Sequence, residues 1–164
     1  DAASYGDLYQ WGRGADGHQS RTSATTATLS STDNPGHGNF ITTSAAPYDW
    51  RSPQNTNLWQ GVDGVNNPCP SGYRLPTEPE WNAEKAIWTV SDAKGAFESP
   101  LKLPVAGGRD LGSGGSLFDV GAYGYYWSST VSSTSSRSLD FDSSAAVMWT
   151  SKRAYGLAVR CLKD

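Results

Sequence analysis

The chain has 164 residues, a formal net charge of -3 and a mean hydropathy of -0.54, with 18 glycines, 9 prolines, 7 tryptophans and 8 tyrosines. This length fits one domain, and the acidic balance without any basic run argues against a nucleic-acid-binding protein. No apolar stretch reaches the length of a membrane span, and the abundant Gly and Pro indicate many turns and few long helices.

The N-terminal part of the chain predicts loops that are held by aromatic side chains. Residues Leu8–Trp11 are expected to form a short strand or helical turn that buries an aromatic ring. Arg21–Asn39 is rich in Ser, Thr and Ala and ends in NPGHGN, which predicts a surface loop. The segment that follows carries Trp50 and Trp59 among Asn and Pro residues, and we expect an ordered, irregular loop pinned by these two rings.

The sequence predicts one helix directly after the CPSGYRLP segment. Thr77 is an N-cap candidate, and Glu80 stands three residues later, which is the spacing of a capping box. Trp81 and Trp88 then recur at helical spacing. The pattern predicts a helix over Glu78–Thr89 with both indole rings facing the core.

Short strands are predicted after this helix, joined by tight turns. Leu139 and Phe141 alternate with polar residues, so they are expected to point to one side of a strand while Ser138, Asp140 and Asp142 point to the other. Such strands favour an antiparallel sheet and an α+β, loop-rich domain over residues 1–164 with one or two helices. The predicted strands are Leu101–Arg109, Tyr125–Ser129, Arg137–Asp142, Val147–Thr150 and Leu157–Leu162. The residues predicted to share one buried core are Trp81, Trp127, Leu139, Phe141 and Val159.

The only two cysteines, Cys69 and Cys161, lie far apart in the sequence. Two thiols do not make a zinc site without two further ligands, and His18 and His37 are not at ligand spacing, which makes them loop residues in our interpretation. The cysteines form either a disulfide that closes a long loop or two reduced thiols, and the sequence leaves both open.

Five motifs occur in a recognisable order: LYQWGR with DGH, NPCPSGYRLPTEPEWNAE, LPVAGGR, GYYWSST and RAYGLAVRCLKD. This set resembles the C-type-lectin-like domains related to formylglycine-generating enzymes, and most closely the variable proteins of diversity-generating retroelements. The resemblance spans Leu8–Asp164. It implies a C-type-lectin-like fold whose C-terminal strands carry a ligand-binding face. Relatives carry an upstream strand that this chain is expected to lack.

Small side chains, many of them serines, fill the region from Ser128 to Ser151 between framework residues. Such side chains build no core and perform no acid–base chemistry, and they are typical of positions on a display surface. In the family that the chain resembles, mutagenic reverse transcription randomises adenine-containing codons near the 3′ end of the gene. The expected ligand-binding residues are Ser135, Ser136, Ser138, Asp140, Asp142, Ala145, Val147, Trp149, Thr150, Ser151 and Lys152.

These observations predict a non-enzymatic recognition domain without metal or cofactor. The expected partner is a protein or glycan on a cell surface, and the expected location is a cell surface or a phage tail tip.

Several alternatives stay open. One is a structural surface or adhesin module of the same fold without programmed diversity, in which the polar strand residues are an ordinary solvated face and Trp149 belongs to the core. Another is a formylglycine-generating enzyme, although that chemistry uses two cysteines close together near the C-terminus. Calcium-dependent sugar binding would require an acidic loop that we do not find in the sequence.

Overall fold

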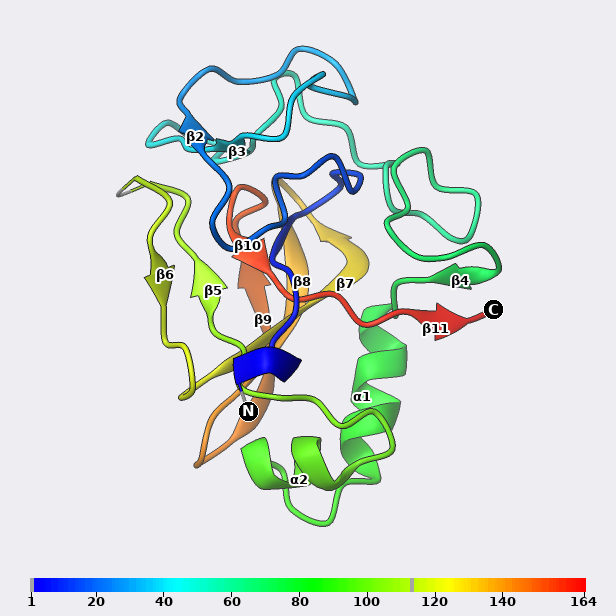
Figure 1. Ribbon diagram of the computed structural model, residues 1–164. Coiled ribbons are helices and arrows are strands. Elements are labelled where there is room, and N and C mark those ends of the chain that lie inside the picture. Colours follow the sequence, from blue (N-terminus) through cyan, green and yellow to red (C-terminus); the bar gives the residue numbers. More distant parts are fainter. Residues whose placement is uncertain (1, 113) are drawn as a thin grey trace.

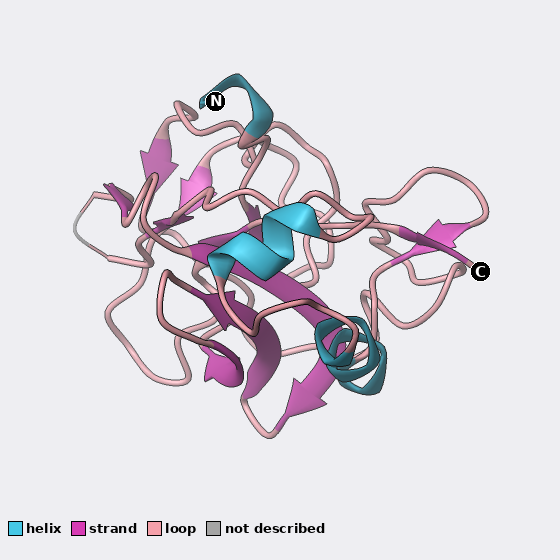
Figure 2. Ribbon diagram, turned by 90° about the horizontal axis from the view of Figure 1, so that it is seen from below, coloured by secondary structure: helices cyan, strands magenta, loops and turns pink. Residues whose placement is uncertain are grey.

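The computed structural model describes residues 2–112 and 114–164, and its arrangement is shown in Figures 1 and 2. It is a mixed α+β, loop-rich fold with mainly antiparallel strands, which confirms the expected class. Within the described residues, no helix is long and apolar enough to cross a bilayer. The elements in chain order are η1 (Ala2–Ser4), β1 (Tyr9–Gln10), β2 (Thr25–Thr26), β3 (Phe40–Ile41), β4 (Tyr73–Arg74), α1 (Glu78–Ala86), α2 (Ala93–Glu98), β5 (Gly108–Arg109), β6 (Leu117–Phe118), β7 (Gly124–Ser132), β8 (Ser135–Phe141), β9 (Ala146–Ser151), β10 (Gly156–Leu157) and β11 (Leu162–Lys163).

The central sheet is antiparallel, in the order β7-β8-β9. Leu139 of β8 pairs with Tyr126 on one side and with Met148 on the other, and these residues point towards the helices. Phe141 lies on the same side, with its ring stacked on that of Tyr126 at 5.7 Å and edge-on to Trp88 at 5.9 Å. The predicted alternation of Leu139 and Phe141 is therefore confirmed, and it packs this side of the sheet against α1 and α2.

Helix α1 begins where the sequence predicts. Thr77 and Glu80 form the full capping box, because the Thr77 hydroxyl accepts from the Glu80 N–H while the Glu80 carboxylate accepts from the Thr77 N–H. The helix ends at Ala86, three residues earlier than predicted. Trp81 and Trp88 are buried as expected, and the Trp81 indole N–H donates to the Trp127 carbonyl at 3.1 Å.

Two strand predictions need correction. The predicted strand Leu101–Arg109 is reduced to β5, because Lys102 takes a positive φ of 50° and Pro104 cannot donate to a ladder. The predicted strand Leu157–Leu162 is split into β10 and β11, which belong to different sheets. Strand β10 lies between β1 and β5, and β11 pairs with β4, so the C-terminal segment joins distant parts of the chain (Figure 1).

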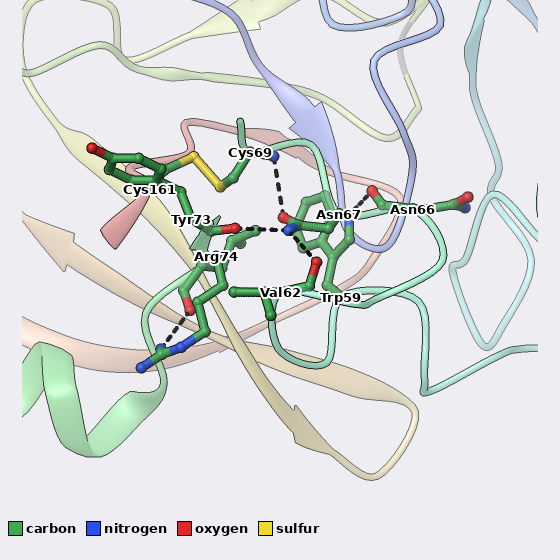
Figure 3. The surroundings of a disulfide bond; sticks show 9 residues. Trp59, Val62, Asn66, Asn67, Cys69, Tyr73, Arg74 and Cys161 are labelled. Atoms are coloured by element: carbon green, nitrogen blue, oxygen red, sulfur yellow. Dashed lines mark hydrogen bonds between the residues drawn. A yellow bond between two sulfur atoms is a disulfide. The ribbon is translucent and has the colours of Figure 1, made fainter. Parts of the chain in front are cut away.

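Cys69 and Cys161 form a disulfide with a Cα–Cα distance of 5.7 Å (Figure 3). The bond spans 92 positions, and a loop of that length corresponds to about 4–5 kcal/mol of stabilisation in the chain-entropy account. Asn67 organises the loop beside it, since its side-chain oxygen accepts from the Cys69 N–H and its amide donates to the Val62 and Tyr73 carbonyls. The structure thus selects the disulfide from the two alternatives.

The expected single core is divided into separate clusters, so that prediction is wrong in part. Leu139, Phe141 and Trp81 belong to the cluster under the helices. Trp127 lies on the opposite side of the sheet in a second cluster, against which the half-buried Val159 packs. The second cluster consists of Trp11, Trp59, Leu75, Trp127 and Leu157.

The long N-terminal loops are anchored by buried aromatic and cationic side chains. Trp50 and Trp59 are almost completely buried, as predicted for pinning residues, and the Trp50 indole N–H donates to the Trp11 carbonyl at 2.8 Å. The fully buried Arg153 guanidinium lies 4.6 Å from the Trp11 ring centroid and donates to the carbonyls of Ser133 and Ser135. These contacts tie the loops to the end of the β7–β8 hairpin.

Candidate functional site

The side of the central sheet that faces away from the helices is covered over only half of its length. Trp127 and its cross-strand partner Ser138 lie under the second cluster and are fully buried. Tyr125, Asp140 and Val147 are aligned across β7, β8 and β9 beyond that cover. We call this uncovered part, with Tyr125, Asp140, Val147 and Trp149, the open face.

Trp149 is the most prominent side chain of the open face. It stands on the edge strand β9 opposite Ser138 and is 62% exposed. The structure therefore does not place it in the core. Because the facing residue on β8 is small and buried, the indole has no large neighbour to pack on at this pair. A large exposed aromatic ring is typical of an interaction hot spot.

Two surface hollows meet at the open face, with volumes of about 470 Å³ and about 230 Å³. Tyr125, Asp140 and Trp149 line both hollows, so these three residues form the ridge between them. The larger hollow is completed by Asp110, Phe118, Thr150, Ser151, Lys152, Tyr155 and Leu157. The smaller hollow is completed by Tyr123, Phe141, Asp142, Ser144, Ala145 and Val147.

The structure brings most of the predicted binding residues to these hollows. Asp140 and Trp149 line both of them. The larger hollow also receives Thr150, Ser151 and Lys152, and the smaller one receives Asp142, Ala145 and Val147.

Three predicted binding residues, Ser135, Ser136 and Ser138, are buried and do not belong to an exposed patch. Ser138 shares a side with Asp140, as the alternation predicts, and its hydroxyl donates to the Asp140 carboxylate at 2.6 Å. However, the second cluster and two separate loops, one carrying Gln54 and the other Arg153, cover this end of the hairpin. The alternation correctly identifies the side of the strand, but not what lies on top of it.

An aromatic wall of the larger hollow was not among the predicted binding residues. Phe118 of β6 lies 5.4 Å from Tyr125 and 6.0 Å from Tyr155, measured between ring centroids. Tyr123 stacks on Tyr125 at 5.7 Å with nearly parallel rings, which extends the wall towards the smaller hollow. The alternation of Tyr123 and Tyr125 in the sequence could have indicated that both rings lie on one side of the strand. The position of Phe118 beside them could not be predicted, because β6 reaches Tyr125 only through the tertiary fold.

Carboxylates set the electrostatic character of the face. Burial raises the pKa of Asp140 to about 6, with the hydrogen bond from Ser138 acting in the opposite direction. Asp142 accepts hydrogen bonds from Ser144 and Ala145, which hold its pKa at about 2. Burial also raises the pKa of Tyr125, whose hydroxyl donates to Asp119 at 2.7 Å. The open face therefore combines aromatic rings with a negative potential at neutral pH.

The cysteines and His18, to which the sequence assigned no metal site, have structural partners. Both cysteine sulfurs are held in the disulfide. His18 is buried: its Nε2 accepts from the Gln10 N–H, its Nδ1 lies 2.7 Å from Asp16, and burial lowers its pKa to about 4. Across residues 2–112 and 114–164 there is no group of three His, Cys, Asp or Glu side chains that could hold a metal ion.

The open face is thus the part of the described molecule where exposed aromatic and acidic side chains converge on two hollows. Comparison with known proteins found no family model, no curated protein and no solved structure that matches this chain.

Proposed function

We propose that this chain is a non-enzymatic ligand-recognition domain with a C-type-lectin-like fold, and that the open face and its two hollows form the binding surface. The observation that carries the proposal is the exposed Trp149, placed between two hollows on an edge strand that contributes little to the core. The five ordered sequence motifs are what favours the lectin-like fold.

The construction of β9 supports a separation between specificity and stability. Ala146 is buried and Met148 packs against the cluster under the helices. Val147 and Trp149, which alternate with them, are 46% and 62% exposed. Since neighbouring residues of a strand point to opposite sides, the exposed positions can change identity without altering the packed ones. A surface whose residues are diversified requires this property.

The proposed ligand is a protein or glycan on the surface of a cell, and the proposed setting is a cell surface or phage tail tip. The disulfide fits an oxidising environment, where such bonds persist. The disulfide, the capped helix and the buried Trp residues form a framework that does not include the open face. Programmed diversity is the finer part of the proposal, and a near-copy of the 3′ end of the gene beside a reverse-transcriptase gene would support it.

The function is tested with a display library in which Ala145, Val147, Trp149 and Thr150 are randomised together. We expect selection against cell-surface proteins and glycans to yield binders whose melting temperatures stay within a few degrees of the parent. A matched library at exposed positions that line neither hollow, such as Val65 and Asp63, should yield none. If the face library unfolds, or if both libraries give binders equally, the proposal is wrong.

A further inference from the structure

The larger hollow combines an aromatic wall with two carboxylates that form no salt bridge among the described residues. Phe118, Tyr125 and Tyr155 form one wall, and Trp149 stands at the ridge. Asp110 and Asp140 also line the hollow. Within the part of the chain that the structure describes, neither carboxylate forms a salt bridge.

We propose that this hollow binds a basic side chain of a protein partner, with arginine preferred over lysine. The inference rests on the proposed recognition function and names the chemistry of its ligand. Aromatic faces attract cations, and a planar guanidinium can stack on a ring while its N–H groups donate to carboxylates on either side. Asp110 and Asp140 provide acceptors at the wall, and the indole of Trp149 can cover the methylene stem.

The state of Asp140 supports a cationic rather than a neutral occupant. Its carboxylate is largely withdrawn from water, accepts a hydrogen bond from Ser138 and has its pKa raised to about 6 by burial. A guanidinium beside it would compensate this desolvation. The charge of Asp110 is also felt in the hollow. The pKa of Tyr155 is raised, first by burial and second by the negative charge of Asp110.

Among the residues that the structure describes, Lys152 is the one cationic side chain that lines the larger hollow. Its ammonium lies 5.3 Å from the ring centroid of Tyr48, on the loop beside the hollow. The described part of the lining therefore carries two carboxylates and one ammonium. Lys152 would repel a second cation, so its removal should strengthen binding. The proposal therefore also predicts a variant with higher affinity.

The requirement for N–H donors separates a basic side chain from a quaternary ammonium such as a choline headgroup. A choline group offers the rings a cation but offers the carboxylates no hydrogen bond. The proposal therefore commits to a protein partner and makes choline binding an opposing outcome.

The test is an NMR titration of the ¹⁵N-labelled chain at pH 7.5 with N-acetyl-arginine methylamide. The citrulline analogue, which has nearly the same shape without the charge, serves as the matched control. Choline and the lysine analogue are titrated separately as two further probes. We expect the arginine probe to shift amides around Trp149, Ser151 and Tyr155 with millimolar affinity, which is typical of a single side chain. The lysine probe should bind more weakly, and citrulline and choline more weakly still.

Four variants decide whether the hollow is responsible. Asp140→Asn and Trp149→Ala should each weaken the arginine probe about three- to tenfold, and Lys152→Gln should strengthen it about two- to threefold. Asp63→Asn removes an exposed carboxylate that lines neither hollow, so it should leave the affinity nearly unchanged. Thermal unfolding confirms that each variant is folded.

Equal binding of citrulline or choline, shifts that map elsewhere, or no shifts at tens of millimolar probe would overturn the assignment. The failure of this inference is distinguishable from the failure of the proposed function. If the probe does not bind but the face library still yields binders, recognition stands and only the basic-side-chain ligand is lost.

Discussion

Strands β8 and β9 are neighbours in the central sheet, yet they have opposite roles. In β8 most side chains are buried on both sides of the sheet, including Ser135, Ser136 and Ser138. In β9 only one side is packed, and Val147 and Trp149 are exposed. The small serines thus allow close packing in the central strand, whereas the open positions of the edge strand hold the larger Val147 and Trp149. The place of a strand in the sheet decides which of the two applies.

The largest expected difference between the two strands concerns Phe141 of β8. Phe141→Ala should lower the free energy of unfolding by about 3–5 kcal/mol, because the ring fills a packed site between Tyr126 and Trp88. The same ring also lies where a Cβ on Gly124 would stand, so the site is tightly filled. Chemical denaturation measures the loss. Val147→Ala on β9 is the control, and a comparable loss there would remove the contrast between the strands.

A bulky residue placed at Ser138 tests the correction to the predicted binding residues. Ser138→Tyr should destabilise the fold by about 1–3 kcal/mol, because the site is completely buried beneath the second cluster. Ala145→Tyr, at an exposed position beside the smaller hollow, should be nearly neutral. Thermal unfolding of both variants gives the comparison. If Ser138→Tyr is as stable as the parent, the covered half of the face is open in solution.

Asp140 is the residue of β8 that reaches the open face. The pH dependence of the free energy of unfolding measures how much its buried charge destabilises the fold. Because its pKa rises from 3.8 in the unfolded chain to about 6 in the fold, the native state binds more protons between these values, and stability falls as pH rises through this range. Asp140→Asn removes the charge, so we expect it to exceed the parent in stability by about 1–3 kcal/mol at pH 7.5 and to match it near pH 4.

The comparison with Asp140→Asn is needed because His18 titrates in the same range with the opposite sign. Its pKa is lowered from 6.5 to about 4, so its contribution is complete above pH 6.5 and is lost as pH falls towards 4. Denaturation curves of parent and variant at several pH values cancel this effect in their difference. A difference that does not change between pH 4 and 7.5 would contradict the raised pKa of Asp140.

The smallest expected effect is at the exposed positions of β9. Trp149→Ser combined with Val147→Thr should change the free energy of unfolding by less than about 1 kcal/mol, since each exposed substitution contributes about 0.5 kcal/mol or less. Differential scanning calorimetry of the double variant provides the measurement. A loss of several kcal/mol would show that Trp149 supports the core, and the display function would then lose its physical basis.

Features governed by neighbouring residues could be predicted from the sequence. The capping box of Thr77 and Glu80 starts α1, and the alternation of Leu139 and Phe141 gives the side of β8 that packs under the helices. Both depend on backbone geometry within a few positions. The open face was predicted in part for the same reason, because Asp140, Val147 and Trp149 follow the alternation of their strands.

Only the tertiary structure decided what covers each surface. It buried Ser138 beneath a cluster of residues drawn from Trp11 to Leu157, closed the disulfide over 92 positions and brought Phe118 of β6 to the ring of Tyr125. Each of these contacts joins segments far apart in the chain, and no local pattern specifies which segment will lie over a given strand. Burial of a polar residue is therefore a property of the assembled layers, whereas the direction of its side chain is already a property of the strand.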